Sequence, residues 1–465
     1  MPKKDFNELL HLIDEYESNI RFGHVQYFSE EDYLQIIDFY LEENHQDKAL
    51  EAARHGTATY PYSTIFYYRE ADLLIKSHQE EKAISVLNYA ITLAPAAPRG
   101  YLLKAEAYAY LDRYDEAMDV LEQLSEAHPD AAVQADIFLV EALIYENQEQ
   151  YELMFIALQA ALREVPNHQE ALERLALCVE LTRNYEASVT IHEKILEQEP
   201  YCYFAWYNLG QAHAYLGNYQ EAIEAYEYAI VSNESFEPAY RDCAELCFEL
   251  NAMHKSLRWY QEILERFEPD AELFLKIGQI YQQLENYNQA RTYLTRAMHL
   301  DHMNDEVHFH IGVCFAREKK WASAIRSYEK AIQIEDLREE YFAALGEALF
   351  EKGDIEEGIE MFDKATSLAP EEPAYWILFA TNLLAVGQPE AAVEVMEDAI
   401  YCSTGTELLY CRATCLFACG QRNEAIYQLG EALTEDFELH SVMFTWLPAL
   451  KDDATVLSLL ASFAT

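Results

Sequence analysis

The chain has 465 residues, of which 82 are acidic and 33 are basic, so its formal net charge is −49 at pH 7. This length exceeds what one compact hydrophobic core supports. The carboxylate excess excludes nucleic acid and anionic membrane surfaces as expected partners, because both are bound through Lys and Arg.

The first residues, 1–6, are not followed by an apolar stretch, so we expect no signal peptide. The sequence contains no run of eighteen apolar residues, so we expect no membrane span. The nine cysteines are scattered and odd in number, which is typical of reduced thiols. We therefore expect a cytoplasmic protein. Residues 5–19 are predicted as an amphipathic helix.

From residue 30 onward, one pattern recurs every 34 residues: a small residue is followed twelve and nineteen positions later by two more small residues. Gly210 is followed by Ala222 and Ala229, and Gly278 and Gly312 each begin the same spacing. A period of this length indicates tandem helix–turn–helix units. We place the units at 30–63, 64–97, 98–131, 135–168, 169–202, 203–236, 237–270, 271–304, 305–338, 339–372, 373–405 and 406–439. Three extra residues, 132–134, interrupt the phase, and the unit 373–405 is one residue short.

Each unit is expected to hold two amphipathic helices that cross at the small residues. In 203–236, the first helix carries Trp206, Leu209 and Gly210 on one face, and the second carries Ala222 and Tyr226. Proline closes many units, because it ends the second helix.

The segment 205–210, with sequence AWYNLG, and the segment 219–223, with sequence YQEAI, resemble the tetratricopeptide repeat. The resemblance covers residues 30–439. It implies an all-α fold, a right-handed superhelical α-solenoid of tetratricopeptide helix–turn–helix repeats. Residues 1–29 are then an N-terminal capping helix and residues 440–465 are C-terminal capping helices.

The segment 440–465 is more apolar than the outer face of a solenoid cap usually is. Its two apolar stripes contain Met443, Trp446 and Leu450, and then Val456 and Phe463. Two interpretations stay open. The stripes cover the last repeat, or they form a surface for self-association or docking.

No catalytic constellation stands out in the sequence. Cys411, Cys415 and Cys419 lie on one helical face, a spacing that suits either a soft metal or ordinary core packing. We predict that the chain is not an enzyme and uses no metal and no cofactor.

The resemblance implies that the first helix of each repeat lines a concave groove. The residues carried onto that groove make it net acidic, with Glu106, Glu170 and Glu180 among the acids and Arg99 and Arg174 among the fewer bases. Some relatives bind a carboxylate tail through basic residues around an Asn. In this chain Asn208 matches that Asn, but the positions that should hold its partner residues in the neighbouring repeats are acidic or apolar. We therefore do not expect this chain to bind a carboxylate tail in that way.

The exposed groove residues near the middle of the chain are the predicted partner-binding site. They are Phe204, Tyr207, Asn208, Gln211, Tyr215, Arg241, Glu245, Phe248 and Lys276. Aromatic residues and Arg are common interface anchors, although some of these rings are equally suited to packing on a neighbouring helix.

We therefore expect a non-enzymatic protein–protein interaction scaffold. Its acidic concave groove would bind a basic or basic–aromatic segment of a partner protein. The alternative is a structural assembly subunit that self-associates, or docks on a larger complex, through its apolar segment 440–465.

Overall fold

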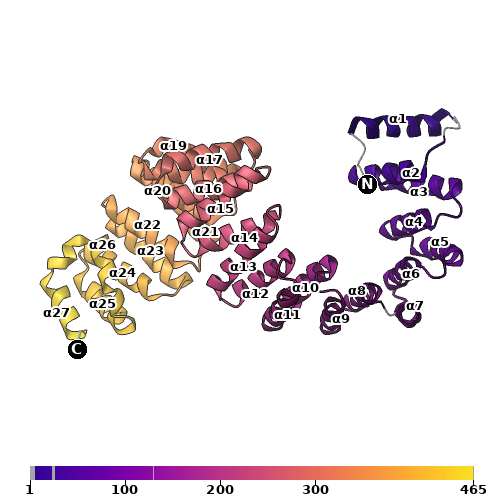
Figure 1. The fold of residues 1–465 in the computed structure, drawn as a ribbon. Coiled ribbons are helices and arrows are strands. Elements are labelled where there is room, and N and C mark those ends of the chain that lie inside the picture. The colour runs from indigo at the N-terminus through magenta and orange to yellow at the C-terminus, as the bar shows by residue number, and fades with distance from the viewer. Residues whose placement is uncertain (1–5, 23–26, 129, 464–465) are drawn as a thin grey trace. The chain divides into compact units, whose positions relative to one another are not determined.

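The computed structural model describes residues 6–22, 27–128 and 130–463 (Figure 1). All regular structure in these ranges is helical. The helices before the central region are α1 (Phe6–Phe22), α2 (Glu30–Glu42), α3 (Gln46–Thr59), α4 (Thr64–Lys76), α5 (Glu80–Leu93), α6 (Pro98–Tyr110), α7 (Tyr114–Ala127), α8 (Ala131–Asn147), α9 (Tyr151–Glu164), α10 (Gln169–Thr182), α11 (Tyr185–Gln198), α12 (Tyr203–Tyr215), α13 (Tyr219–Ser232) and α14 (Glu237–Glu249). They are followed by α15 (Met253–Arg266), α16 (Ala271–Gln283), α17 (Tyr287–Leu300), α18 (Asp305–Arg317), α19 (Trp321–Ile334), α20 (Glu339–Lys352), α21 (Ile355–Leu368), α22 (Pro373–Ala385), α23 (Pro389–Cys402), α24 (Thr406–Ala418), α25 (Arg422–Glu435), α26 (Met443–Trp446) and α27 (Ala454–Phe463). Short 3₁₀ helices cover Glu438–Val442 and Pro448–Asp452.

The chain forms two compact units, residues 1–246 and residues 247–465. Within the described residues, α2 to α25 form twelve consecutive helix pairs, as the 34-residue period predicts. In the first unit, the first helix of a pair packs on the first helix of the next, as α4 does on α6 and α6 on α8. We call the surface formed by α4, α6, α8, α10, α12 and the part of α14 that belongs to the first unit the first-helix face. The all-α solenoid architecture is therefore confirmed.

A left-handed residue ends the first helix of each pair. Its φ lies between 54° and 100°, a region that favours glycine. The described residues in this conformation are Asn44, His78, Asp112, Glu149, Arg183, Gly217, Asn251, Glu285, Lys319, Gly353, Gly387 and Gly420. The turn is closed by backbone hydrogen bonds, such as the 2.9 Å bond from Asn218 N to His213 O. This recurrent turn sets the direction in which each second helix returns.

The predicted small residues lie where the two helices of a pair cross. A Cβ atom on Gly210 would lie 2.6 Å from the ring of Tyr226, and one on Gly312 would lie 2.5 Å from the ring of Tyr328. Real Cβ atoms do not approach other atoms so closely, so the glycines are required for the aromatic rings to pack here.

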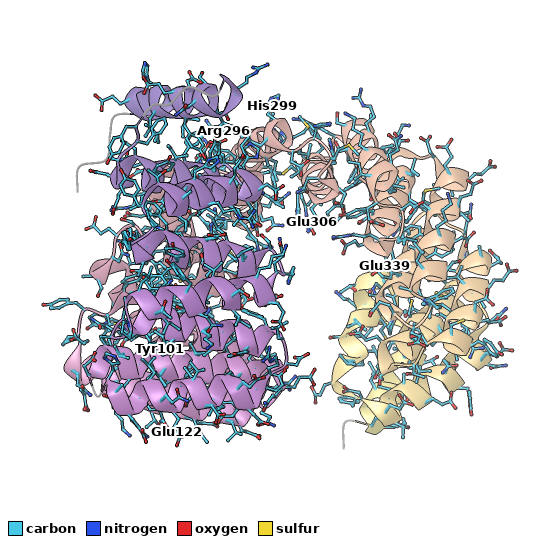
Figure 2. All side chains as sticks on the ribbon, turned by 90° about the vertical axis from the view of Figure 1, so that its right-hand side faces the viewer. Tyr101, Glu122, Arg296, His299, Glu306 and Glu339 are labelled. Atoms are coloured by element: carbon cyan, nitrogen blue, oxygen red, sulfur yellow. The ribbon has the colours of Figure 1, made fainter. Side chains whose placement is uncertain are left out.

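Aromatic residues near the start of several first helices bind the turn that precedes them. Trp206 Nε1 donates to Pro200 O at 2.8 Å, and Trp376 Nε1 donates to Pro370 O at 2.9 Å. The Tyr101 hydroxyl, labelled in Figure 2, donates in the same way to Pro95 O. The turn at the end of one repeat is thus fixed to the first helix of the next.

The two irregular repeats change the length of one helix and of one connection at the irregular positions. Residues 132–134 lengthen α8 to 17 residues, and Asp130 caps its start by accepting from Val133 N at 3.2 Å. Gln134 Nε2 donates to His128 O at 2.7 Å, which ties the extra turn to the preceding connection. In the short repeat, three residues instead of four join α23 to α24.

Helices at both ends cover apolar surface of the neighbouring pair. Leu12, Ile13 and Tyr16 of α1 are buried, and the Tyr16 ring meets the Phe28 ring edge-on at 5.8 Å. The helix expected at 5–19 runs to Phe22, and residue 5 lies outside the described residues. Near the other end, Met443, Leu450 and Val456 are buried in the core that surrounds α24 and α25.

Candidate functional site

A hollow of about 220 Å³ lies on the first-helix face of the first unit. Its residues come from three consecutive first helices, so we call it the α6–α8–α10 hollow. It is lined by Arg99, Leu102, Glu106, Tyr110, Asp136, Leu139, Val140, Leu143, Glu170 and Arg174. The stacking of successive repeats brings these side chains together, because equivalent faces of successive first helices lie side by side.

The hollow combines apolar surface with charged groups. Leu102, Leu139 and Val140 are buried and form its apolar surface, while the Tyr110 ring remains 49% exposed. Arg99 and Glu170 are exposed. The site therefore offers a patch of apolar surface together with charges that a ligand can reach from solvent.

Two of the lining charges already have partners in the protein. Arg174 Nη2 forms a 2.6 Å ion pair with Glu146 Oε2, and Arg174 Nη1 donates to Leu139 O at 3.3 Å. His168 Nδ1 accepts from Ala171 N at the start of α10, which leaves Nε2 to donate to Asp136 Oδ1 at 3.4 Å. The Arg174 charge is consequently neutralised within the face.

Glu106 is the most perturbed carboxyl group of the hollow. Its pKa is raised to about 7, chiefly because burial disfavours the charged form, and Asp72 and Glu170 raise it further. Arg99 and Arg174 act in the opposite direction. At neutral pH this group is therefore divided between its protonated and ionised forms.

Along the same face, three polar side chains of α12 and α14 form a cluster. Gln211 Nε2 donates to the Tyr207 hydroxyl at 3.0 Å, and both side chains lie close enough to Asp242 to act on its pKa. Burial raises the pKa of Asp242, and these two donors partly oppose the rise. The predicted residues Tyr207 and Gln211 are thus brought together around a carboxyl group.

Tyr215 is the most exposed aromatic residue of the predicted site, with 60% of its surface accessible. Its ring stacks on the Tyr185 ring, with centroids 4.6 Å apart and planes 14° from parallel. A small recess beside the two rings is bounded by Glu180 and Gln211 as well. The stacked pair therefore presents a rigid ring next to a carboxylate.

Asn208 is placed inside the protein. Only 4% of it is exposed, and its Nδ2 donates to Leu172 O at 2.9 Å and contacts His192 Nε2 at 3.3 Å. His192 is fully buried, and its Nδ1 donates to Ser188 O at 2.8 Å. In this structure the Asn208 side chain joins two repeats and is buried at the base of the small recess, whereas its position in the sequence predicted an exposed side chain.

The remaining predicted residues take different positions. Phe204 and Tyr207 both pack on the Phe236 ring, with centroids 5.0 Å apart in each case. Arg241 pairs with Glu237 at 2.6 Å, and Glu245 is exposed. Phe248 and Lys276 belong to the second unit, where both residues are half-buried.

Within the described ranges, no group of three or more His, Cys, Asp or Glu side chains is arranged to hold a metal ion. Cys411 and Cys415 are buried in the core of the second unit. A hydrogen bond with Cys415, together with burial, raises the pKa of the Cys411 thiol well above its ordinary value. Among the described helices, none is long and apolar enough to cross a membrane.

Four family models described as tetratricopeptide repeats match the chain, at residues 74–136, 203–236, 275–337 and 339–372. The matches fall on helix pairs of both units. The chain contains tetratricopeptide repeats in both units. In such a protein the first-helix face is built from successive repeats, and a sequence change in one repeat alters one segment of that face.

Several known proteins are similar to this tetratricopeptide repeat chain. Mouse DnaJ homolog subfamily C member 7 is 23% identical over 247 residues, 48% of this chain and 47% of that protein, so the match spans about half of the relative's length. Yeast Tom70 is 15% identical over 97% of this chain and 98% of that chain, with a TM-score of 0.41. YrrB, whose structure is described as a TPR protein with an unusual peptide-binding site, is 21% identical over 40% of this chain and 95% of that chain, with a TM-score of 0.34.

Proposed function

We propose that this protein is a non-enzymatic interaction scaffold whose first-helix face binds a basic or basic–aromatic segment of a partner protein. The observation that carries the proposal is the α6–α8–α10 hollow, where apolar and charged side chains of three successive repeats converge. Solenoids of this type use such extended faces to bind other proteins.

Charge favours a basic partner. Two of the bases on the face are paired with neighbouring carboxylates, Arg174 with Glu146 and Arg241 with Glu237. Exposed carboxylates such as Glu170 and Glu180 remain. With a net charge of −49, the whole chain attracts cations at long range, so association is expected to be fast and sensitive to salt.

The aromatic residues provide anchors beside these carboxylates. The stacked ring of Tyr215 is exposed and held in one orientation by Tyr185, so little side-chain entropy is lost when a partner covers it. Tyr207, Gln211 and Asp242 lie on the same face and offer hydrogen-bonding groups. Phe248 and Lys276 remain predicted contacts on the second unit.

The test is a pull-down with the full chain from source-cell lysate, with washes at low and then high salt. The expected result is a basic protein that is lost at high salt. A variant with E106Q, E170Q and E180Q should lose this protein, whereas the matched variant E122Q, E193Q and E224Q, with three acids of second helices neutralised, should retain it. Equal retention by both variants would refute the acidic face as the binding surface.

A second function, that of an assembly subunit, is favoured by one observation. Helix α27 contains no charged residue, yet its Leu457 and Phe463 are 47% and 38% exposed. An oligomer or complex that forms through residues 440–465 would cover them. Light scattering of the full chain, compared with L457E and F463E, tests this function. A wild-type protein that stays monomeric and captures no stoichiometric complex would contradict the assembly function.

A further inference from the structure

The geometry of the α6–α8–α10 hollow points to a receptor for one arginine side chain, presented by an extended segment of the partner protein and held between Glu106 and Glu170. The inference rests on the proposed function, because it assigns one residue of the partner to one place on the first-helix face.

The size and lining of the hollow suit a single long side chain. A volume of about 220 Å³ is below the range of roughly 300–1,000 Å³ that is usual for small-molecule and cofactor sites. Leu102, Leu139 and Val140 provide apolar surface for a hydrocarbon stem. Arginine buries such a stem while its charged end remains near polar groups.

The lining carries three carboxyl groups, Glu106, Asp136 and Glu170, and two bases, Arg174 and the exposed Arg99, so its acids outnumber its bases. The Arg174 charge is neutralised by Glu146, and Asp136 accepts a hydrogen bond from His168. Glu106 and Glu170 are the other two carboxylates of the lining, and they are close enough for Glu170 to raise the pKa of Glu106. A cation bound between them would relieve this repulsion.

Arginine fits the site better than lysine because of its shape. The guanidinium group is planar, it donates to carboxylates through two parallel N–H groups, and it stacks on aromatic rings. The hollow places a half-exposed ring, that of Tyr110, on the same lining as the two carboxylates. A lysine ammonium offers a point charge and does not stack in this way.

Binding should be linked to the loss of a proton from Glu106. The ionisable groups that face Glu106 are Asp72 from α4, Arg99 and Tyr110 from α6, Asp136 and Glu146 from α8, and Glu170 and Arg174 from α10. Because the pKa of Glu106 is about 7, this carboxyl is mostly neutral at pH 6 and mostly ionised at pH 8. An arginine prefers the ionised form, so its affinity should rise by about tenfold over this interval.

The experiment is calorimetric titration of the full chain, to millimolar concentration, with glycine–serine pentapeptides that differ only in the central residue. That residue is arginine, its uncharged isostere citrulline, lysine or norleucine. At pH 8 the arginine peptide should bind roughly tenfold more tightly than the citrulline peptide and more tightly than the lysine peptide. E106Q should weaken the arginine peptide and abolish its pH dependence, and E170Q should weaken it at both pH values.

The matched control is E122Q, which removes the same charge from an exposed position on α7 (Figure 2) and should leave the titration unchanged. Equal binding of arginine and citrulline peptides, an E106Q variant that keeps the pH dependence, or no binding at millimolar peptide would each overturn the inference. The failure of the scaffold function is a separate result, because it would appear in the pull-down as a partner insensitive to the triple glutamine variant.

Discussion

Asn208 Nδ2 donates a 2.9 Å hydrogen bond to the carbonyl oxygen of Leu172, 36 residues earlier, and so joins α12 to α10 inside the first unit. The same amide group lies 3.3 Å from Nε2 of the fully buried His192. A residue that the sequence offered as a ligand contact therefore holds together the two repeats on which the exposed contacts are displayed. This bond therefore contributes to the stability of the part of the face that presents the exposed residues of the proposed site.

Replacement of Asn208 by Ala should lower the free energy of unfolding by about 1–3 kcal/mol. The substitution leaves the acceptor nitrogen of the buried His192 without a partner and removes the second hydrogen bond to Leu172 O, which keeps its backbone bond within α10. Urea denaturation measures the effect, and Q123A on the exposed side of α7 is the control, with an expected change below about 0.5 kcal/mol. An N208A variant as stable as the wild type would contradict the structural role.

His192 should make the protein less stable in mild acid. Burial lowers its pKa to about 4, whereas an unfolded histidine titrates near 6.5. The unfolded chain therefore takes up the proton first. The stability associated with neutral His192 is present above pH 6.5 and is lost as the pH falls toward 4, by about 2 kcal/mol at pH 5.

Melting of the wild type and of H192Q at pH 7 and pH 5 measures this loss. The melting temperature of H192Q should fall less between the two pH values. H299Q, which changes an exposed histidine on α17 (Figure 2), should behave as the wild type does. Identical pH dependence in all three proteins would show that His192 is not the responsible group.

Glu106 should reduce stability at neutral and alkaline pH, the opposite direction to His192. A carboxyl with a folded pKa of about 7 and an ordinary value of 4.5 costs nothing below pH 4.5, and its cost grows as the pH rises through 7. E106Q should therefore raise the melting temperature at pH 8, equivalent to about 1–3 kcal/mol, and leave it almost unchanged at pH 4. A stabilisation that is equal at both pH values would mean that desolvation of the charge is not the cause.

The sequence predicted the repeats, their helices and their crossings because small residues at fixed spacing have one physical use, the close approach of two helices. Its groove assignments also placed Glu106, Glu170 and Arg174 on the face where the hollow lies. It did not predict that Asn208 is buried. Whether a polar side chain in a first helix faces solvent or the preceding repeat depends on residues about 36 positions away, such as Leu172.

Two further features, the left-handed turns and the packing of two aromatic rings, can be recognised only in the structure. Gly217, Gly353, Gly387 and Gly420 mark the left-handed turn, but the other eight repeats place a residue such as Arg183 or Lys319 there, so composition alone does not reveal the pattern. The positions of Phe204 and Tyr207 in the first helix of their repeat predict exposed aromatic side chains. In the structure, both rings pack on Phe236. Local sequence defines the helix, and the tertiary neighbour determines which side chains are left for a partner.

The two glycines Gly312 and Gly430 should respond in opposite directions when replaced by Ala. Both lie inside helices, where Ala is favoured over Gly by about 1 kcal/mol. A Cβ atom on Gly312 would lie 2.5 Å from the Tyr328 ring, and overpacking of a core costs about 1–3 kcal/mol, so G312A should lower stability. Nothing lies within 4 Å of a Cβ atom on Gly430, so G430A should raise stability by up to about 1 kcal/mol. Urea denaturation of the two variants beside the wild type measures both shifts, and a stabilising G312A would show that the helix crossing has room for a methyl group.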